Sequence, residues 1–370
     1  MIPRAWFAGV LAEDLLEVSD DPAVLDGGGW WAVVATFEGR VGLWRFGSVR
    51  RAPLPVAGPW HGPGPHDWTS SLSRDGYLAG VREVRRRIRE GDVYQVNLCR
   101  TLRAPLPPDA DPWALAVVLA SGNPAPFAAV LDLPGEPLDS GRIRVVSASP
   151  ELFLDRDRDR LRSSPIKGTA TTASRLLPKD EAENVMIVDL VRNDLQHVSR
   201  PGSVVVSALL DKEPHPGLVH LVSTVEGRLR PGISWPAVLA ATFPPGSVSG
   251  APKSSALRTI TDLEPSPRGP YCGAIGWVDA DRRRARLAVG IRTFWWQRDA
   301  LTRAREAGLE RLAQPGDELC FGTGAGITWG SDAAAEWAET ELKASRLVGL
   351  ASGGQTTGYG AARSAGREGR

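Results

Sequence analysis

The order of hydrophobic and polar residues predicts a mixture of short strands and amphipathic helices. Residues 1–60 alternate short apolar runs with glycine and proline, which is the pattern of β-hairpins. In residues 75–90, apolar side chains recur at helical spacing and arginines occupy the opposite face. This segment is predicted to be a helix that ends at Gly91, because glycine favours the left-handed conformation that closes many helices.

The rest of the chain continues this alternation, with more strands than helices. Further strands are predicted over 92–100, 143–155, 159–163, 203–210, 218–229, 271–279, 285–296 and 317–321. Further helices are predicted over 180–198, 234–242, 254–263 and 332–350. Most strands follow one another at hairpin-like spacings, so the sequence favours an α+β fold with antiparallel sheets.

The same pattern divides the chain into a main domain and smaller flanking parts. Residues 1–60 are predicted to form a β-rich segment that packs on a main domain over 61–350. Residues 297–316 have the composition of a solvent-exposed insertion. The stretch 351–370 is rich in glycine and serine with scattered arginines, and is predicted to be a disordered tail.

Composition excludes several classes of function. The 370 residues are 42% hydrophobic and 24% charged, and the net charge of +1 gives no electrostatic reason to bind nucleic acid or an anionic membrane. No apolar run approaches the ~20 residues of a membrane-spanning helix, and the N-terminus lacks a secretion signal. Three widely separated cysteines predict a reducing, cytoplasmic location without a metal-binding cysteine motif.

Lysine is rare in this chain. Of 44 basic residues, only five are lysine. They are Lys167, Lys179, Lys212, Lys253 and Lys343. Where arginine is the usual cation, a remaining lysine is a candidate for a task that needs a neutral amine, although chance retention is the alternative.

Two predicted helices carry carboxylates at suggestive positions. The helix that begins near Asp180 contains Glu183, and the last helix carries Glu336, Glu339 and Lys343 on one face. Each group has a simple explanation by itself, as a capping box in the first helix and a surface ion pair in the last. Together they offer oxygen ligands from two helices to a hard cation such as Mg²⁺, which commonly keeps some waters.

Two glycine-rich turns are predicted between these helices. One runs over residues 243–253 and the other over 322–327. The second lacks the GxGxxG spacing of a dinucleotide-binding loop, which excludes that interpretation. Glycines in such turns still bring backbone N–H groups close to an anion, and Arg292 at a predicted strand end is a candidate carboxylate clamp.

These motifs, taken in order, resemble the chorismate-utilising enzymes. The similarity covers about residues 75–348 and rests on the segments GDVYQVNL, SASPELFL, PIKGT, ENVMIVDLVRNDL, HLVSTVEG, FPPGSVSGAPK, YCGAIGW, AVGIRT, GTGAGI and EWAETELK. The resemblance implies a chorismate-utilising enzyme fold, in which two antiparallel sheets pack together, helices lie outside, and the active site occupies the cleft between the sheets. It also implies Mg²⁺ as cofactor and chorismate as substrate.

The resemblance assigns roles to individual residues. Glu183 and Glu339 correspond to the magnesium ligands, with Asp180 and Glu336 behind them. Glu151 corresponds to the general acid that protonates the departing C4 hydroxyl, a role that needs a desolvated carboxyl with a raised pKa. His220, beside the ring carboxylate, corresponds to a further catalytic residue. The residues that correspond to the substrate contacts are Gln95, Gly168, Thr169, Ser247, Tyr271, Arg292, Gly324, Ala325, Gly326 and Lys343.

Two positions distinguish the reactions within the family. Gln95 stands where the water-using isochorismate and salicylate synthases carry a lysine base, so delivery of hydroxide is disfavoured. Lys167 stands where anthranilate synthases carry alanine, and it matches the lysine with which aminodeoxychorismate synthases attack C2 of the ring. The resemblance therefore implies an aminodeoxychorismate synthase component I, which contributes to 4-aminobenzoate and folate synthesis and receives ammonia from a separate glutamine amidotransferase.

Two alternatives remain open from sequence. One is anthranilate synthase component I, and the other is a non-catalytic regulatory relative. The chain also departs from the family pattern, because Gln196 and His197 follow RNDL where glycine and arginine are usual, and Ser247 replaces a common threonine. None of these departures removes a group that the chemistry needs.

Overall fold

A computed structural model describes residues 2–138, 141–170, 172–176, 178–215, 218–298 and 316–353. The predicted tail, from 354 onward, and the middle of the predicted insertion, 299–315, lie outside these residues. Within the described ranges, no helix is both long enough and apolar enough to cross a membrane.

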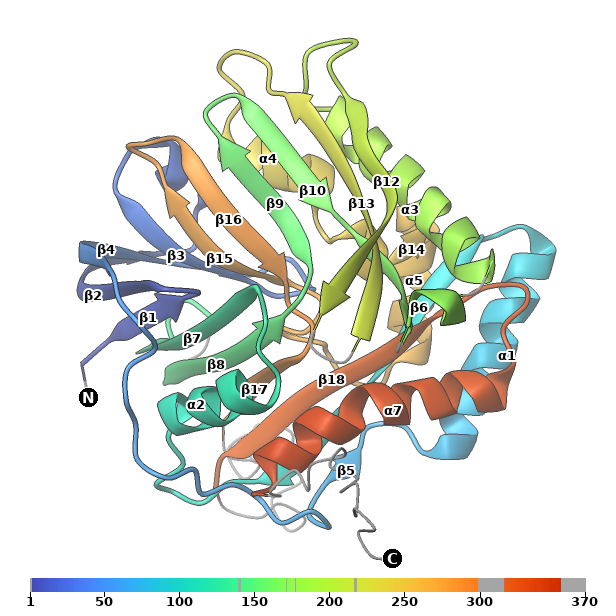
Figure 1. The fold of residues 1–370 in the computed structure, drawn as a ribbon, viewed down its shortest axis with the longest axis horizontal. Helices are drawn as coiled ribbons and strands as arrows, with labels where there is room; N and C mark the ends of the chain where they lie inside the picture. The colour runs from blue at the N-terminus through green and yellow to red at the C-terminus, as the bar shows by residue number, and fades with distance from the viewer. Residues whose placement is uncertain are drawn as a thin grey trace, which may run out of the picture.

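The described residues form 18 strands, and every strand pairing is antiparallel (Figure 1). The first half of the chain provides β1 (Arg4–Phe7), β2 (Val10–Ser19), β3 (Trp30–Ala35), β4 (Val41–Arg51), β5 (Thr69–Ser70), β6 (Gln95–Pro105), β7 (Phe127–Pro134), β8 (Arg142–Ser149), β9 (Leu152–Asp157), β10 (Arg160–Ser164) and β11 (Ile166–Ala170). The second half provides β12 (Val205–His215), β13 (Leu218–Arg228), β14 (Gly250–Ala251), β15 (Ala274–Asp279), β16 (Arg284–Val289), β17 (Thr293–Gln297) and β18 (Glu318–Ile327).

Hydrogen bonds join these strands into one continuous network. Neighbours follow the order β5-β6-β18-β17-β8-β7-β1-β2-β4-β3-β15-β16-β9-β10-β13-β12. In addition, β14 pairs with β6 and β11 pairs with β13. The predicted α+β fold with antiparallel sheets is therefore confirmed, and β1 and β3 of the N-terminal segment pair directly with β7 and β15 of the main domain.

Two parts of this network are connected by the consecutive strands β8 and β9 and by the consecutive strands β16 and β17. The stretches 143–155 and 285–296, each predicted as one strand, are broken in the structure at Glu151 and at Arg292. Before and after these breaks the partners differ, because β8 pairs with β17 whereas β9 pairs with β16. Arg292 has φ of +51°, a left-handed conformation that is uncommon for a residue with a side chain. The breaks turn Glu151 and Arg292 out of the regular ladders.

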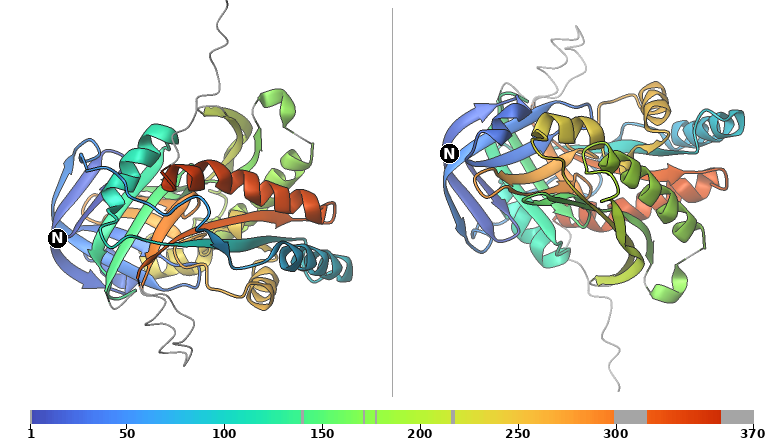
Figure 2. Two further views of the ribbon diagram at one scale, coloured as in Figure 1. Left: turned by 90° about the horizontal axis from the view of Figure 1, so that it is seen from below. Right: turned by 90° about the horizontal axis from the view of Figure 1, so that it is seen from above.

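In the described residues, six α-helices lie on the outside of the sheet (Figure 2). They are α1 (Arg74–Glu90), α2 (Pro112–Gly122), α3 (Pro178–Gln196), α4 (Trp235–Thr242), α5 (Lys253–Leu263) and α7 (Ala333–Ala351). Five of them match predicted helices, and Gly91 ends α1 with φ of +85° as expected. Helix α2 was not predicted, although Asp111 caps it by accepting a hydrogen bond from Trp113 N (3.0 Å) and Pro112 starts it.

The main hydrophobic core lies between the sheet and its helices. Strand β3, which lies between β4 and β15, is buried along its whole length. Helix α3 packs on β13 and β11, and α7 packs on β18 and α1. These contacts hold the N-terminal half of α3 and the face of α7 that carries Glu336 beside the strands β11 and β18.

Candidate active site

Four predicted site residues from distant parts of the chain meet between β11, β6 and β18. The Lys167 ammonium, on β11, donates a hydrogen bond to the carbonyl oxygen of Ser247 at 2.8 Å. A Cβ added to Gly326 would lie 3.6 Å from Lys167 Nζ and 2.4 Å from Gln95 Nε2. Because Gly326 has no side chain, a space remains open beside the Gln95 amide and the Lys167 amine. A larger residue at position 326 would fill this space.

Glu151 lies beside this group and is almost completely buried, with 3% of its surface exposed. Burial raises its pKa to about 7, against the opposing effects of a hydrogen bond from Ser247 and the positive charge of Lys167. Its Oε1 atom is buried without a hydrogen-bond partner among the described residues. Glu151 can therefore hold a proton near neutral pH and deliver it to a bound molecule.

The pKa of the Lys167 amine is shifted downward, which favours its neutral form. Burial lowers its pKa below the ordinary lysine value, although the carboxylates of Glu183 and Glu151 counteract this effect. The nearby positive charge of Lys343 lowers it further. A larger fraction of Lys167 is then present as a neutral amine than for a lysine in water, which is what a nucleophilic lysine requires.

Arg292 places a cation near Glu151 at the break between β16 and β17. Burial lowers the pKa of its guanidinium, and the attraction of Glu151 raises it in part. The backbone carbonyl of Arg292 accepts a hydrogen bond from Ala148 N at 3.0 Å, which fixes the position of the break against β8. The side chain is thus a partly desolvated guanidinium, suited to a carboxylate.

Carboxylates from α3 and α7 approach one another next to Lys167. Burial raises the pKa values of Glu183 and Glu336. The negative charges of Glu336 and Asp180 add to this shift at Glu183, and that of Glu339 adds to it at Glu336. Burial would also raise the pKa of Glu339, but Lys343 lowers it overall, with Nζ 2.7 Å from Glu339 Oε1. The four predicted metal ligands therefore form one negatively charged region.

These carboxylates are not gathered as tightly as ligands around an ion. In the described part of the chain, no three His, Cys, Asp or Glu side chains are close enough to hold one metal. The donor atoms nonetheless suit a hard cation, because all are carboxylate oxygens. Burial and, to a smaller extent, mutual repulsion raise the pKa values of Glu183 and Glu336, and a divalent cation would relieve this repulsion.

The glycine-rich segment 322–327 is a strand and not the predicted turn. It continues β18 and pairs with β6 along its whole length. The glycines are needed for close packing, since a Cβ at Gly322 would lie 2.1 Å from the Tyr271 ring and one at Gly324 would lie 2.5 Å from Cys99 Sγ. The carbonyl of Gly324 accepts a hydrogen bond from Lys343 Nζ at 3.1 Å, so β18 and α7 both hold this lysine.

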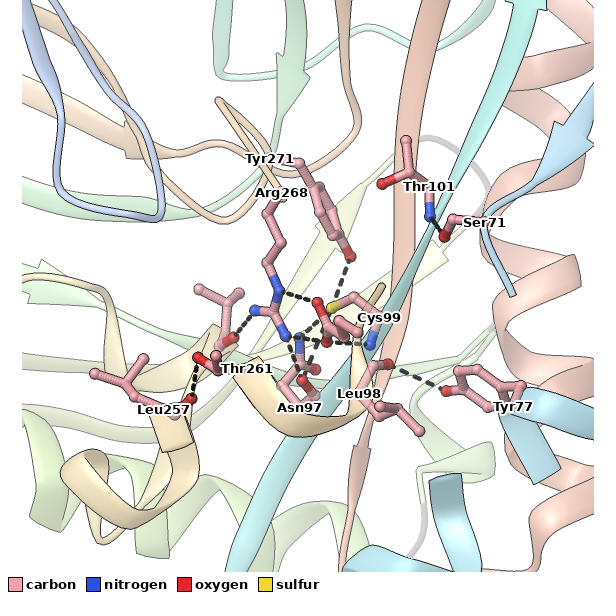
Figure 3. Close-up of polar contacts among 12 residues, drawn as sticks. Ser71, Tyr77, Asn97, Leu98, Cys99, Thr101, Leu257, Thr261, Arg268 and Tyr271 are labelled. Atoms are coloured by element: carbon pink, nitrogen blue, oxygen red, sulfur yellow. Dashed lines mark hydrogen bonds and ion pairs between the residues drawn. The ribbon is translucent and has the colours of Figure 1, made fainter. Parts of the chain in front are cut away.

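Tyr271 belongs to a buried polar cluster behind β6 (Figure 3). Its hydroxyl lies 3.7 Å from Cys99 Sγ. In the same cluster, Arg268 pairs with Glu264 at 2.6 Å and also donates to the carbonyl of Asn97 at 2.6 Å. The structure therefore records a contact of the Tyr271 hydroxyl with Cys99, and the grouping of Tyr271 with Arg292 stays a prediction.

Strands β11 and β13 place the last predicted residues beside α3. His220 is buried on β13 and lies opposite Thr169 in the strand register, whereas the Thr169 side chain is outside the described structure. Gly168 has φ of +83°, and a Cβ there would lie 2.8 Å from Asp180 Cβ. Only glycine fits this position without strain, which keeps β11 close to the start of α3.

Sequence reasoning missed a buried ion pair next to the site. Lys253 Nζ donates to Asp194 Oδ2 at 2.7 Å and to the carbonyl of Thr242 at 3.1 Å. The contact joins the ends of α3 and α4 to the start of α5. The scarcity of lysine was a signal for Lys253, but nothing in the local sequence indicated Asp194 as its partner.

The pKa of Glu151 predicts a pH-dependent contribution to stability that Glu151→Gln should remove. The folded protein keeps a proton on Glu151 up to about pH 7, whereas the unfolded chain releases it near the ordinary value of 4.5. Stability should therefore fall as pH rises between these values, by roughly 3 kcal/mol from this group. Denaturant unfolding of wild type and variant at pH 5 and pH 8 measures the difference, and equal pH dependence would contradict it.

The chain belongs to the chorismate binding enzyme family, whose model matches residues 48–349. It is 38% identical over 291 residues to anthranilate synthase component 1 of Haloarcula marismortui, covering 75% of this chain and 54% of that protein. It is 36% identical over 294 residues to aminodeoxychorismate synthase component 1 of Klebsiella aerogenes, covering 76% and 59%. The chain spans about half the length of the curated relatives it matches.

Solved structures show the same fold at lower identity. The menaquinone-specific isochorismate synthase of Escherichia coli matches with a TM-score of 0.74 at 17% identity, covering 94% of this chain and 88% of that one. Anthranilate synthase component I of Streptococcus pneumoniae matches with a TM-score of 0.71 at 22% identity, covering 94% and 90%. The predicted chorismate-utilising enzyme fold is therefore confirmed.

Proposed function

We propose that this enzyme is an aminodeoxychorismate synthase component I, which replaces the C4 hydroxyl of chorismate with an amino group. The observation that carries the proposal is the pairing of Lys167, an amine with a lowered pKa, with Glu151, an acid whose pKa is about 7. A nucleophile and a general acid with these properties are what a covalent amination requires. The relatives include both aminodeoxychorismate and anthranilate synthases.

The reaction follows from these two groups. The neutral Lys167 amine adds to C2 of the ring, the double bond shifts, and the C4 hydroxyl leaves as water with the proton of Glu151. Ammonia then adds to C4, the double bond shifts back, and Lys167 departs from C2 as the neutral amine. The added nitrogen gives one proton to the Glu151 carboxylate, which restores the acid for the next turnover. The product is 4-amino-4-deoxychorismate, which retains the enolpyruvyl group and serves 4-aminobenzoate and folate synthesis.

Mg²⁺ is the proposed cofactor. Glu183 and Glu339 would hold the ion, with Asp180 and Glu336 behind them, because these carboxylates form the negatively charged region between α3 and α7. When bound, the ion would supply positive charge for the ring carboxylate of chorismate. The chain's own residues then hold the rest of the substrate.

The remaining groups are proposed to orient chorismate. Arg292 and Lys343, with Tyr271 and the β18 backbone at residues 324–326, would bind the enolpyruvyl carboxylate. His220 would lie beside the ring carboxylate, while Gly168, Thr169 and Ser247 line the pocket. Gln95 occupies the position next to Lys167 where a base for water would stand, and its amide has no such basicity.

Anthranilate synthase component I is the second candidate, because a relative of that name is 38% identical to this chain. Lys167 favours amination at C4, since its amine can block C2 while ammonia adds at C4. Mass analysis of the product from chorismate, ammonia and Mg²⁺ separates the two. Anthranilate with released pyruvate would overturn the proposal, and no loss of chorismate at all would indicate a non-catalytic relative.

We expect this chain to use free ammonia directly, and glutamine only when a separate amidotransferase subunit is present. A glutaminase needs an accessible nucleophile, whereas Cys99, Cys272 and Cys320 are all buried. Cysteines that are not joined in disulfides also fit the proposed cytoplasmic location. Product formation with ammonium chloride and with glutamine, each measured for the purified chain, tests the prediction. Glutamine-dependent turnover by the chain alone would contradict it.

A further inference from the structure

Arg268 is a buried arginine to which the reaction proposed above gives no role (Figure 3). Its guanidinium donates four hydrogen bonds. Nε and Nη2 donate to the two carboxylate oxygens of Glu264 at 2.8 and 2.6 Å. Nη1 donates to the carbonyl of Val248 at 2.8 Å, and Nη2 also donates to the carbonyl of Asn97 at 2.6 Å. The guanidinium therefore bridges the segment 243–252 and strand β6.

The two bridged segments are the ones that lie next to the Lys167 amine. Val248 directly follows Ser247, whose carbonyl accepts the hydrogen bond from Lys167 Nζ at 2.8 Å. Asn97 lies two positions after Gln95 on β6, and the Gln95 amide borders the same open space as the Lys167 amine. The guanidinium thus binds the backbone one residue away from the first of these contacts and two residues away from the second.

Backbone pairing with β6 stops short of Ser247. The pairing includes the Asn97 N–H, which donates to the Ser249 carbonyl at 2.9 Å, and continues through β14. Ser247 and Val248 precede these paired residues, and the bond from Arg268 extends the attachment to the Val248 carbonyl. Loss of this bond would allow the Ser247 carbonyl to shift relative to β6, and the Lys167 amine with it.

The N-terminal segment helps to hold Arg268 in this orientation. The Phe37 ring packs against the guanidinium, with Cζ 4.2 Å from the ring centroid. The backbone N–H of Arg268 donates to Glu38 Oε1 at 2.7 Å. The planar guanidinium can bind the Glu264 carboxylate and two carbonyls at once, whereas the compact ammonium of a lysine lacks this fixed fork of donors. The position therefore depends on the shape of arginine as well as on its charge.

We infer that Arg268 is a positioning residue for the Lys167 nucleophile, because it fixes the two backbone segments that border the Lys167 amine. It acts through the carbonyls of Val248 and Asn97 and does not touch the substrate. A displacement of about 1 Å at a reacting group can lower a rate by roughly 100-fold, so a small shift of these segments matters. The inference rests on the proposed function, in which the Lys167 amine adds to C2 of chorismate.

The experiment separates positioning from stability by removing both charges of the ion pair. Arg268→Met alone leaves the Glu264 carboxylate buried without its cation, so the melting temperature should fall. Arg268→Met/Glu264→Gln has no unpaired charge, and the glutamine oxygen can still accept the Cys99 N–H, so its melting temperature should return close to that of the wild type. Its kcat should nevertheless remain about 100-fold below the wild-type value.

Two further measurements locate the defect. The KM for chorismate should change little in Arg268→Met/Glu264→Gln, because the groups proposed to bind the chorismate carboxylates are intact. Without ammonia, the chorismate adduct on Lys167 should form more slowly by the same factor as kcat falls. A pair that serves stability alone would instead regain kcat together with the melting temperature.

A second variant and a matched control keep the outcomes distinct. Arg268→Lys keeps a cation beside Glu264 and should fold, but its kcat should also fall, because an ammonium cannot reproduce the planar bridge. Arg142→Met/Asp132→Asn removes another ion pair with a buried carboxylate, 2.7 Å between Nη2 and Oδ1, and should keep the wild-type kcat. Wild-type kcat in Arg268→Lys or in Arg268→Met/Glu264→Gln would overturn the inference alone. A wild-type enzyme that forms no amination product would overturn the proposed function and, with it, this inference.

Discussion

Lys167→Ala should lower formation of 4-amino-4-deoxychorismate by about 1,000-fold or more, as expected for loss of a catalytic nucleophile. The variant lacks the amine that adds to C2, so ammonia can reach the ring only by direct attack. High concentrations of ammonia should restore slow turnover by adding at C2. That route yields the 2-amino isomer and hence anthranilate-like product. Chromatography with mass detection of both isomers measures the result.

The wild-type enzyme without ammonia provides the positive evidence. Chorismate and Mg²⁺ should then leave an adduct on Lys167, heavier than the peptide by chorismate less water, which peptide mass analysis can locate. Lys212, an exposed lysine on β12, is the matched control and should remain unmodified. If Lys167→Ala keeps the full rate with the 4-amino product, or if no adduct is found on Lys167, the covalent mechanism fails.

Glu183→Gln should reduce turnover by more than about 100-fold while the protein stays folded, since the metal ion that Glu183 is proposed to hold would supply several kcal/mol of charge stabilisation. Burial raises the pKa of the Glu183 carboxylate, and repulsion by Glu336 and Asp180 adds to this shift. Replacing it with a neutral amide relieves repulsion, so the melting temperature should not fall. Loss of activity thus reflects weaker metal binding and not unfolding.

Direct metal binding distinguishes this explanation from a general disturbance. Titration of Mn²⁺ into the wild type, followed by electron paramagnetic resonance, should show binding that Glu183→Gln and Glu339→Gln both weaken. Glu181→Gln, an exposed carboxylate on the same helix, is the matched control and should bind as the wild type does. Near-wild-type activity of Glu183→Gln at limiting Mg²⁺ would show that the metal ligands are assigned wrongly.

Several features of the fold could be predicted because they are encoded locally. Helix α1 combines an apolar face, a capping residue at Ser73 and Gly91 at its end, and all three signals lie within one segment. The breaks at Glu151 and Arg292 could not be predicted in this way. Each flanking strand has β-type sequence, and only pairing with different partners on either side of the break shows that the strand ends there.

The strand at residues 322–327 could not be predicted from the local sequence either. Glycines favour turns when nothing else is known, but here they permit a strand to pack against Tyr271 and Cys99, whose atoms leave no room for a Cβ. Helix α2 was missed because its residues are apolar on all sides and give no helical periodicity. The only local sign of this helix was its start, where Asp111 caps the helix and Pro112 is its first residue.

The sequence by itself determined the kinds of residue available for catalysis, the antiparallel α+β class and the family resemblance, because motifs and periodicities are properties of neighbouring residues. The tertiary structure decided which of these residues meet and how they titrate. The Lys167 amine donates a hydrogen bond to the carbonyl of Ser247, which lies 80 positions away in the sequence. Burial raises the pKa of Glu151 to about 7. Proximity and desolvation depend on packing between distant segments, and no local pattern contains that information.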